Sequence, residues 1–255
     1  MKDYMDVELK KLPATPEFSN SAGRLLSLLN LLNSGKNQNH FDVIASLYGR
    51  TKAENDFKAQ AYVHFMSMVS QTFSDFIGDI RTSEKIPDAS RQVILDGIGR
   101  VMTLAHPINP TSAPQALQGA EVALLRMAGS MLDAEPELEQ DDVDAIRKSI
   151  DELWADVEGS DISKSAKTAM LELCKLSRSS IDYYRIHGAR GFKKAFKGML
   201  AELMAVYLDE GTDVQKTAWW KKAVGHAKLF DTVAAKLSKY KPLLESASTL
   251  FLGGS

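Results

Sequence analysis

The chain has 255 residues, of which 44% are hydrophobic and 25% charged, and its formal net charge is −2. This balance is typical of a globular protein and excludes an intrinsically disordered chain. The sequence contains no run of about 18 apolar residues, the length that a membrane-spanning helix requires. The charged segment Met1–Pro13 lacks the apolar core of a secretory signal, so we expect a cytoplasmic protein.

The N-terminal half of the chain reads as a series of amphipathic helices without any strand pattern. Phe18-Ser19-Asn20-Ser21 offers N-cap residues for a short helix, which is predicted to bury Leu25, Leu28, Leu29 and Leu32. A second helix runs over Phe41–Tyr48. A longer helix over Lys52–Ile80 contains the uncharged run Ala59–Ser74, which has apolar residues in nearly all directions. A helix of this kind is usually buried, so we expect it to be the central helix of this half.

Two further helices complete this half, one after Pro87 and one over Ala116–Leu132. The acidic stretch Ala134–Gln140 contains Pro136 and is the best candidate for a linker. The sequence therefore predicts an N-terminal helical group over residues 1–133 and a C-terminal one over residues 141–255.

The C-terminal half begins with three amphipathic helices. The first carries an apolar stripe at helical spacing, formed by Val143, Ile146, Ile150, Leu153, Trp154 and Val157. The second runs over Ser163–Ile186 and includes Cys174, the single cysteine, which we expect to be a core residue and not a nucleophile. Gly188 is expected to take a positive φ at the turn before the third helix, which ends near Leu208. The apolar stripe that this third helix is expected to turn inward consists of Phe192, Phe196, Met199, Leu203 and Val206.

The last helix has the most regular pattern in the chain. Apolar or aromatic residues recur in steps of four and three, as in a coiled-coil heptad. They are Trp219, Ala223, His226, Phe230, Val233, Leu237 and Tyr240. We call these residues the seam, and we expect the seam either to dock on the preceding three helices or to pair with another copy.

Charge is distributed unevenly along the chain. Residues 132–161 hold twelve acidic and two basic side chains, and residues 162–255 hold eight acidic and sixteen basic side chains. Such blocks can bind each other, a second copy or an outside partner. The simplest interpretation is a solvated acidic helix beside basic ones, and the sequence leaves these alternatives open.

The run 173–191, with its turn Tyr183-Tyr184-Arg185-Ile186-His187-Gly188, resembles a helical segment found in uncharacterised bacterial proteins. This resemblance implies a helical fold and no particular activity. Tyr184 and Arg185 in its turn are candidate binding residues.

Few residues are arranged for catalysis. The five histidines lack metal-ligand spacing, and neither a phosphate loop nor a Gly-x-Ser-x-Gly motif occurs, so we expect no metal and no cofactor. Arg100 and His106 resemble the Arg-x(4–6)-His pair of helical ribonucleases of the HEPN superfamily. That resemblance implies His106 as acid or base and Arg100 as the phosphate ligand.

The sequence thus predicts an all-α multi-helix bundle of about eight or nine helices in two packed groups. The function expected first is non-enzymatic protein interaction or regulation through the charged C-terminal helices, with a protein partner or self-association. The candidate binding residues there are Trp219, Trp220, Lys221, Lys222, Phe230, Leu237 and Tyr240. One alternative is an effector whose cationic C-terminal helix acts on an anionic membrane. Nucleic acid is a less favoured partner, and a HEPN-like ribonuclease is the second alternative.

Overall fold

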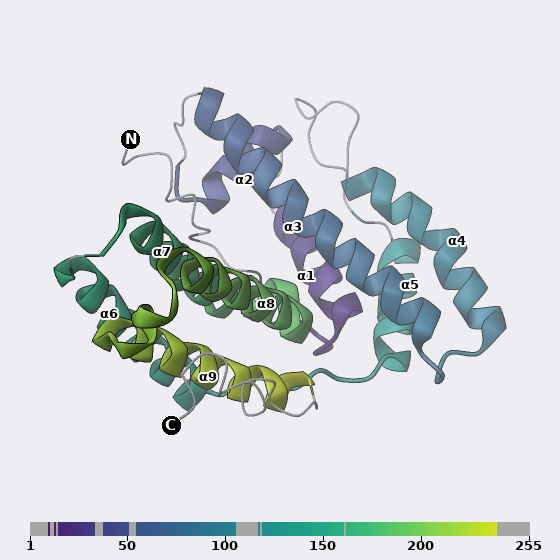
Figure 1. The fold of residues 1–255 in the computed structure, drawn as a ribbon. Coiled ribbons are helices and arrows are strands. Elements are labelled where there is room, and N and C mark those ends of the chain that lie inside the picture. Colours follow the sequence, from purple (N-terminus) through teal and green to yellow (C-terminus); the bar gives the residue numbers. More distant parts are fainter. Residues whose placement is uncertain are drawn as a thin grey trace. The chain divides into compact units, whose positions relative to one another are not determined.

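The protein is all-α, as the computed structural model shows (Figure 1). The structure describes residues 10, 13, 15–33, 38–50, 55–105, 117, 119–160 and 162–238. Within these ranges the chain forms nine α-helices and one 3-10 helix, and no β-strand. The chain divides into two compact units. Unit 1 comprises residues 1–134 with 185–187, and unit 2 comprises residues 135–184 and 188–255.

Unit 1 contains the first five helices, α1 (Ser21–Leu32), α2 (His40–Leu47), α3 (Asn55–Thr82), α4 (Asp88–Ala105) and α5 (Gly119–Met131). The Asn20 side chain caps α1 by accepting a hydrogen bond from the Gly23 N–H, and its Nδ2 donates to the Gly129 carbonyl of α5 at 2.9 Å. The same residue therefore starts one helix and ties it to another. The leucines predicted for α1 are buried.

Helix α3 packs against α1, α2 and α4, the position expected of a central helix. Phe65, Val69 and Phe73 from its uncharged run are buried. The prediction of burial in nearly all directions is wrong for one side, because Val63 is exposed. Ser67 and Ser70 lie in the same exposed row, and small hydroxyl side chains make an uncharged helix face compatible with water.

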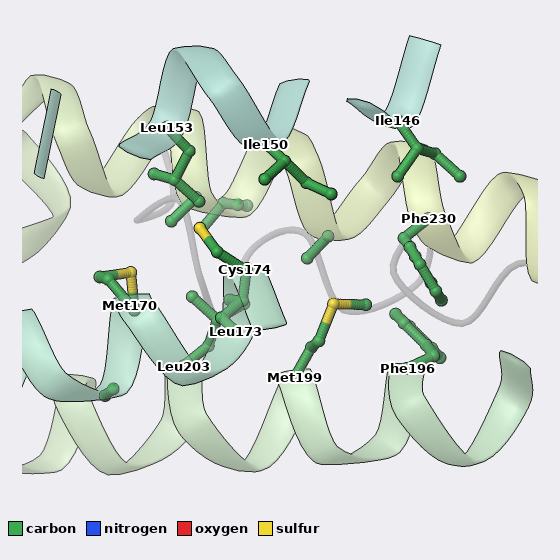
Figure 2. Close-up of a cluster of buried hydrophobic side chains, with 14 of the residues drawn as sticks. Ile146, Ile150, Leu153, Met170, Leu173, Cys174, Phe196, Met199, Leu203 and Phe230 are labelled. Atoms are coloured by element: carbon green, nitrogen blue, oxygen red, sulfur yellow. The ribbon is translucent and has the colours of Figure 1, made fainter. Parts of the chain in front are cut away.

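Unit 2 is built from α6 (Gln140–Gly159), α7 (Lys164–Asp182), α8 (Tyr184–Glu210), the 3-10 helix η1 (Thr212–Lys216) and α9 (Ala218–Ser238). The four α-helices place one apolar stripe each into a common core. Figure 2 shows Ile150 of α6, Leu173 of α7, Met199 of α8 and Phe230 of α9 converging there. The seam residues from Trp219 to Leu237 are buried in this core, so α9 packs within its own unit.

Two local predictions in unit 2 have different outcomes. Gly188 has φ +58° and interrupts the helical backbone near the start of α8, as its turn position predicts. Trp154 is 39% exposed, so its assignment to the core stripe of α6 is wrong. The core-facing residues are Ile146, Ile150, Leu153 and Val157. Trp154 follows Leu153 by one residue, and this step turns its side chain about 100° away from the core.

Candidate binding surface on helix α8

Four of the predicted binding residues on α9 are core residues. Trp219, Trp220, Phe230 and Leu237 are buried within unit 2. Phe230 lies flat on Phe192 of α8, with ring centroids 3.9 Å apart. In this conformation the seam is covered by helices of the same unit, so partner binding through it stays a prediction that requires α9 to move. Tyr240 lies outside the described residues.

The remaining predicted residues differ in their environments. Lys221 is exposed, and Lys222 pairs with Asp156 of α6 through an Nζ–Oδ2 distance of 2.7 Å. The Tyr184 hydroxyl donates to the Pro136 carbonyl at 2.7 Å and thereby ties the start of α8 to the segment before α6. Arg185, which belongs to unit 1, is exposed.

The candidate ribonuclease pair is only partly described. Arg100 is exposed on α4, and His106 lies outside the described residues. The HEPN-like assignment therefore stays a prediction.

The acidic and basic blocks pair within one molecule. Carboxylates of α6 form ion pairs with α7 and α9, and one arginine of α6 pairs with a carboxylate of α7. The pairs are Asp142–Lys236 at 2.9 Å, Asp156–Lys222 at 2.7 Å, Asp151–Arg178 at 3.3 Å and Arg147–Asp182 at 3.2 Å. Some of the charged side chains that could bind an outside partner are therefore already paired inside unit 2.

A buried hydrogen-bond chain joins α6, α7 and α9. His226 of α9 is buried, its Nε2 lies 2.7 Å from the Ser177 Oγ, and its Nδ1 lies 2.9 Å from the Ser149 Oγ. The Ser177 hydroxyl also lies 2.9 Å from the Leu173 carbonyl, which can only accept. With the proton of His226 on Nε2, Nε2–H donates to Ser177 and Ser149 donates to Nδ1, while Ser177 has two acceptors for its own proton, the Leu173 carbonyl and the Met199 Sδ at 2.8 Å.

Ser149 and His226 have the geometry of a nucleophile and its base. Burial lowers the pKa of His226 to about 4, however, and a general base is effective when its pKa is near the working pH. A cavity of about 210 Å³ adjoins the pair, lined by Ser149, Glu152, Leu153, Lys222, Gly225 and His226. Because His226 is so weak a base, the hydrogen-bond chain is better suited to a structural role, in which it fixes α6, α7 and α9 in register.

The most distinctive surface of unit 2 is the outward side of α8. Six exposed residues follow one another in steps of four and three, which places them in one row along the helix. They are Arg190, Lys194, Lys197, Ala201, Met204 and Leu208. We call this row the α8 outer stripe. Leu208 is 74% exposed and Met204 39%, which is unusual for large apolar side chains that recur on one helix face.

The outer stripe changes character along its length. Its N-terminal half is basic and its C-terminal half is apolar. Lys194 and Lys197 take part in no ion pair among the described residues. The helix ends in acidic residues, where Asp209 and Glu210 accept hydrogen bonds from Ser165 and Ser163 of α7. A basic half, an apolar half and an acidic end thus follow one another along α8.

Sequence reasoning identified the inward stripe of α8 but not Met204 and Leu208. Their signal is present in the sequence, since Lys197, Ala201, Met204 and Leu208 have heptad spacing of their own. When a helix has two apolar rows, its sequence does not indicate which row faces the core and which is exposed. The His226 chain carries no comparable signal, because its members come from three different helices.

Among the described residues, no helix is long and apolar enough to cross a bilayer, and no group of His, Cys, Asp and Glu side chains is arranged to hold a metal ion. Comparisons with protein-family models, curated proteins and solved structures found no match for the chain.

Proposed function

We propose that the chain is a non-enzymatic interaction protein that binds a protein helix along the α8 outer stripe. The observation that carries this proposal is the exposure of Met204 and Leu208 in line with Lys194 and Lys197. Apolar residues at heptad spacing on a surface helix fit the groove or face of another helix. The basic residues beside them favour a partner with acidic side chains at the corresponding positions.

The stripe also fits this function because its scaffold is rigid. Helix α8 places Phe192, Phe196, Met199, Leu203 and Val206 into the core of unit 2, opposite the outer stripe. A helix fixed in this way presents its exposed side chains without a large ordering cost on binding. Binding through α8 would also leave the buried α9 in place.

The membrane alternative is less well supported. It requires the cationic α9 to leave a core that contains Trp220 and Phe230, two of the largest buried side chains of unit 2. Exposing two such side chains would cost several kcal/mol, roughly 2 kcal/mol or more each.

The test is site-specific photocrosslinking on the full chain in cells that express it. Benzoylphenylalanine replaces Leu208 in one variant and Thr232 in a control; Thr232 is exposed on α9, two residues from Phe230, which packs on Phe192 at the other end of α8. We expect a discrete adduct from position 208 that disappears when Met204→Glu is added, and no such adduct from position 232. The absence of an adduct at 208, or the same adducts at both positions, would exclude the proposed surface.

A further inference from the structure

We propose that the partner of the α8 outer stripe is a second copy of this chain, bound antiparallel across a two-fold axis that passes close to Met204. This inference rests on the proposed function, because it names the partner of the same surface. It follows from the order of charged and apolar residues along one helix.

A parallel arrangement of two α8 helices is unfavourable. It would set Lys194 and Lys197 against the same lysines of the second copy, and Asp209 against Asp209. Like charges that face each other across a helix pair destabilise the pair and are a common means of excluding an orientation. The stripe therefore selects against its own parallel pairing.

An antiparallel arrangement reverses this relationship. With Met204 on the axis, a residue seven positions before it lies opposite a residue seven positions after it. Lys197 then lies beside Gly211 of the second copy, next in sequence to the carboxylates of Asp209 and Glu210, whereas Asp213 just beyond them is already paired with Lys216. The C-terminus of a helix carries a partial negative charge of its own, which further favours a lysine there.

The apolar half fits the same register. Met204 meets Met204, and Ala201 of each copy faces Leu208 of the other, because both lie three to four residues from the axis. A small residue opposite a large one lets two helices approach closely. Seven residues span about 10 Å of helix, so the contact covers just under two turns on each side of the axis. An interface this short is smaller than the roughly 1,600 Å² of a standard complex, so we expect weak, micromolar dimerisation.

The first experiment uses single-cysteine reporters on the purified full chain under mild oxidation with diamide. The native Cys174 is buried and burial raises its thiol pKa to about 11, so the wild-type chain provides a low background. We expect Met204→Cys to form a disulfide dimer at least tenfold faster than Thr232→Cys, which places the thiol on the exposed side of α9. Ala201→Cys and Leu208→Cys should crosslink slowly alone and rapidly when mixed.

The pattern of crosslinks decides the arrangement. Efficient self-crosslinking of Ala201→Cys, Met204→Cys and Leu208→Cys alike would indicate a parallel pair and overturn the register. Crosslinking of Met204→Cys no faster than of Thr232→Cys would overturn the second copy as partner. In that case a photocrosslinked adduct with a different protein at position 208 would leave the proposed function standing, whereas no adduct would remove both.

The second experiment exchanges charges and measures dimerisation by sedimentation equilibrium at low salt. Lys197→Glu should raise the dimer Kd at least tenfold, because the new carboxylate faces the acidic end of the other α8. Adding Asp209→Lys to the same chain should restore most of the affinity, since symmetry brings each changed residue to the other. Lys148→Glu, an equal charge change at a lysine of α6 whose side chain is 79% exposed, is the control and should change the Kd less than threefold. No weakening by Lys197→Glu, or no recovery in the double variant, contradicts the antiparallel contact.

Discussion

The ring of Phe230 on α9 stacks on the ring of Phe192 on α8, with centroids 3.9 Å apart and planes 8° from parallel. Both side chains are buried. The contact joins the helix with the seam to the helix with the outer stripe, so the position of α8 depends on α9. Helix α9 is therefore a structural element of unit 2, and we expect unit 2 to lose stability when α9 or its Phe230 ring is removed.

Phe230→Ala should therefore destabilise unit 2 instead of abolishing only a partner contact. Truncation of a buried phenylalanine removes its transfer free energy and leaves a cavity, which together cost about 3–5 kcal/mol. The three tryptophans, Trp154, Trp219 and Trp220, all belong to unit 2, so their fluorescence reports its unfolding separately from that of unit 1. A urea titration followed by this fluorescence measures the loss.

The control for this change is Thr232→Ala, which alters an exposed residue two positions along α9. It should shift the urea midpoint only slightly, because surface substitutions usually stay within about 0.5 kcal/mol. If Phe230→Ala unfolds at the midpoint of Thr232→Ala, α9 does not contribute to the core as described. Ending the chain at Gly211 should remove the cooperative transition of unit 2 altogether.

The stability of unit 2 should fall as the solution is acidified through the range in which His226 titrates. Burial lowers the folded-state pKa from 6.5 to about 4, so the unfolded chain binds the proton more readily between these values. Stability is then unaffected by this residue above pH 6.5, declines below it, and has lost the full contribution below about pH 4. A shift of this size corresponds to about 3 kcal/mol.

The matched variant is His226→Gln, which keeps a side-chain donor and acceptor for Ser149 and Ser177 but does not titrate. All other groups titrate alike in the two proteins, so the difference between their stability–pH curves isolates His226. We expect the wild-type curve to be steeper between pH 4 and 6.5. Parallel curves over this interval would show that the imidazole is not held neutral by burial.

The fold class could be predicted from the sequence because helical periodicity is a local property. Asn20, the leucines of α1 and the stripe from Ile146 to Val157 follow patterns that need only neighbouring residues. Trp154 was misassigned because a residue beside the stripe is separated from it only by rotation around the helix. What covers that position is decided by neighbouring helices that come later in the chain.

The functional interpretation was harder to predict for the same reason. The heptad spacing of the α9 seam occurs both in core helices and in helices that bind other proteins. It therefore does not indicate whether the seam is covered by the same chain or by another one. The ion pairs Asp142–Lys236 and Asp156–Lys222 join residues 94 and 66 positions apart, so a charge count along the chain could not assign them. Exposure of Met204 and Leu208 likewise depends on which side of α8 the core takes.

Gly225 should be a site where a larger residue stabilises the protein. It lies inside α9 beside the cavity, and an added Cβ would meet nothing within 4 Å. Replacing a helical glycine by alanine reduces the entropy of the unfolded chain, so Gly225→Ala should raise the stability of unit 2 by about 0.5–1 kcal/mol. Gly198→Ala in α8 is the comparison. Its new Cβ would lie 3.0 Å from Leu176 Cδ1, so this substitution should raise the stability of unit 2 by less. An equal gain at both positions would contradict the packing difference.

The ion pair between Lys236 and Asp142 should contribute little to stability, although it joins the two charge blocks. The Asp142 carboxylate accepts a hydrogen bond from Lys236 at 2.9 Å and raises the pKa of that lysine, but the lysine side chain is 55% exposed and that of Asp142 is 16% exposed, so water screens the pair from the lysine side. Exposed pairs contribute at most about 1 kcal/mol and are screened by salt. A double-mutant cycle with Lys236→Met and Asp142→Asn, measured by urea unfolding followed through tryptophan fluorescence, should give a small coupling energy. That coupling energy should vanish at about 1 M salt, where charges are screened within about 3 Å. A coupling several times larger, or one that salt leaves unchanged, would mean that the charge blocks and not the aromatic core hold α9 in place.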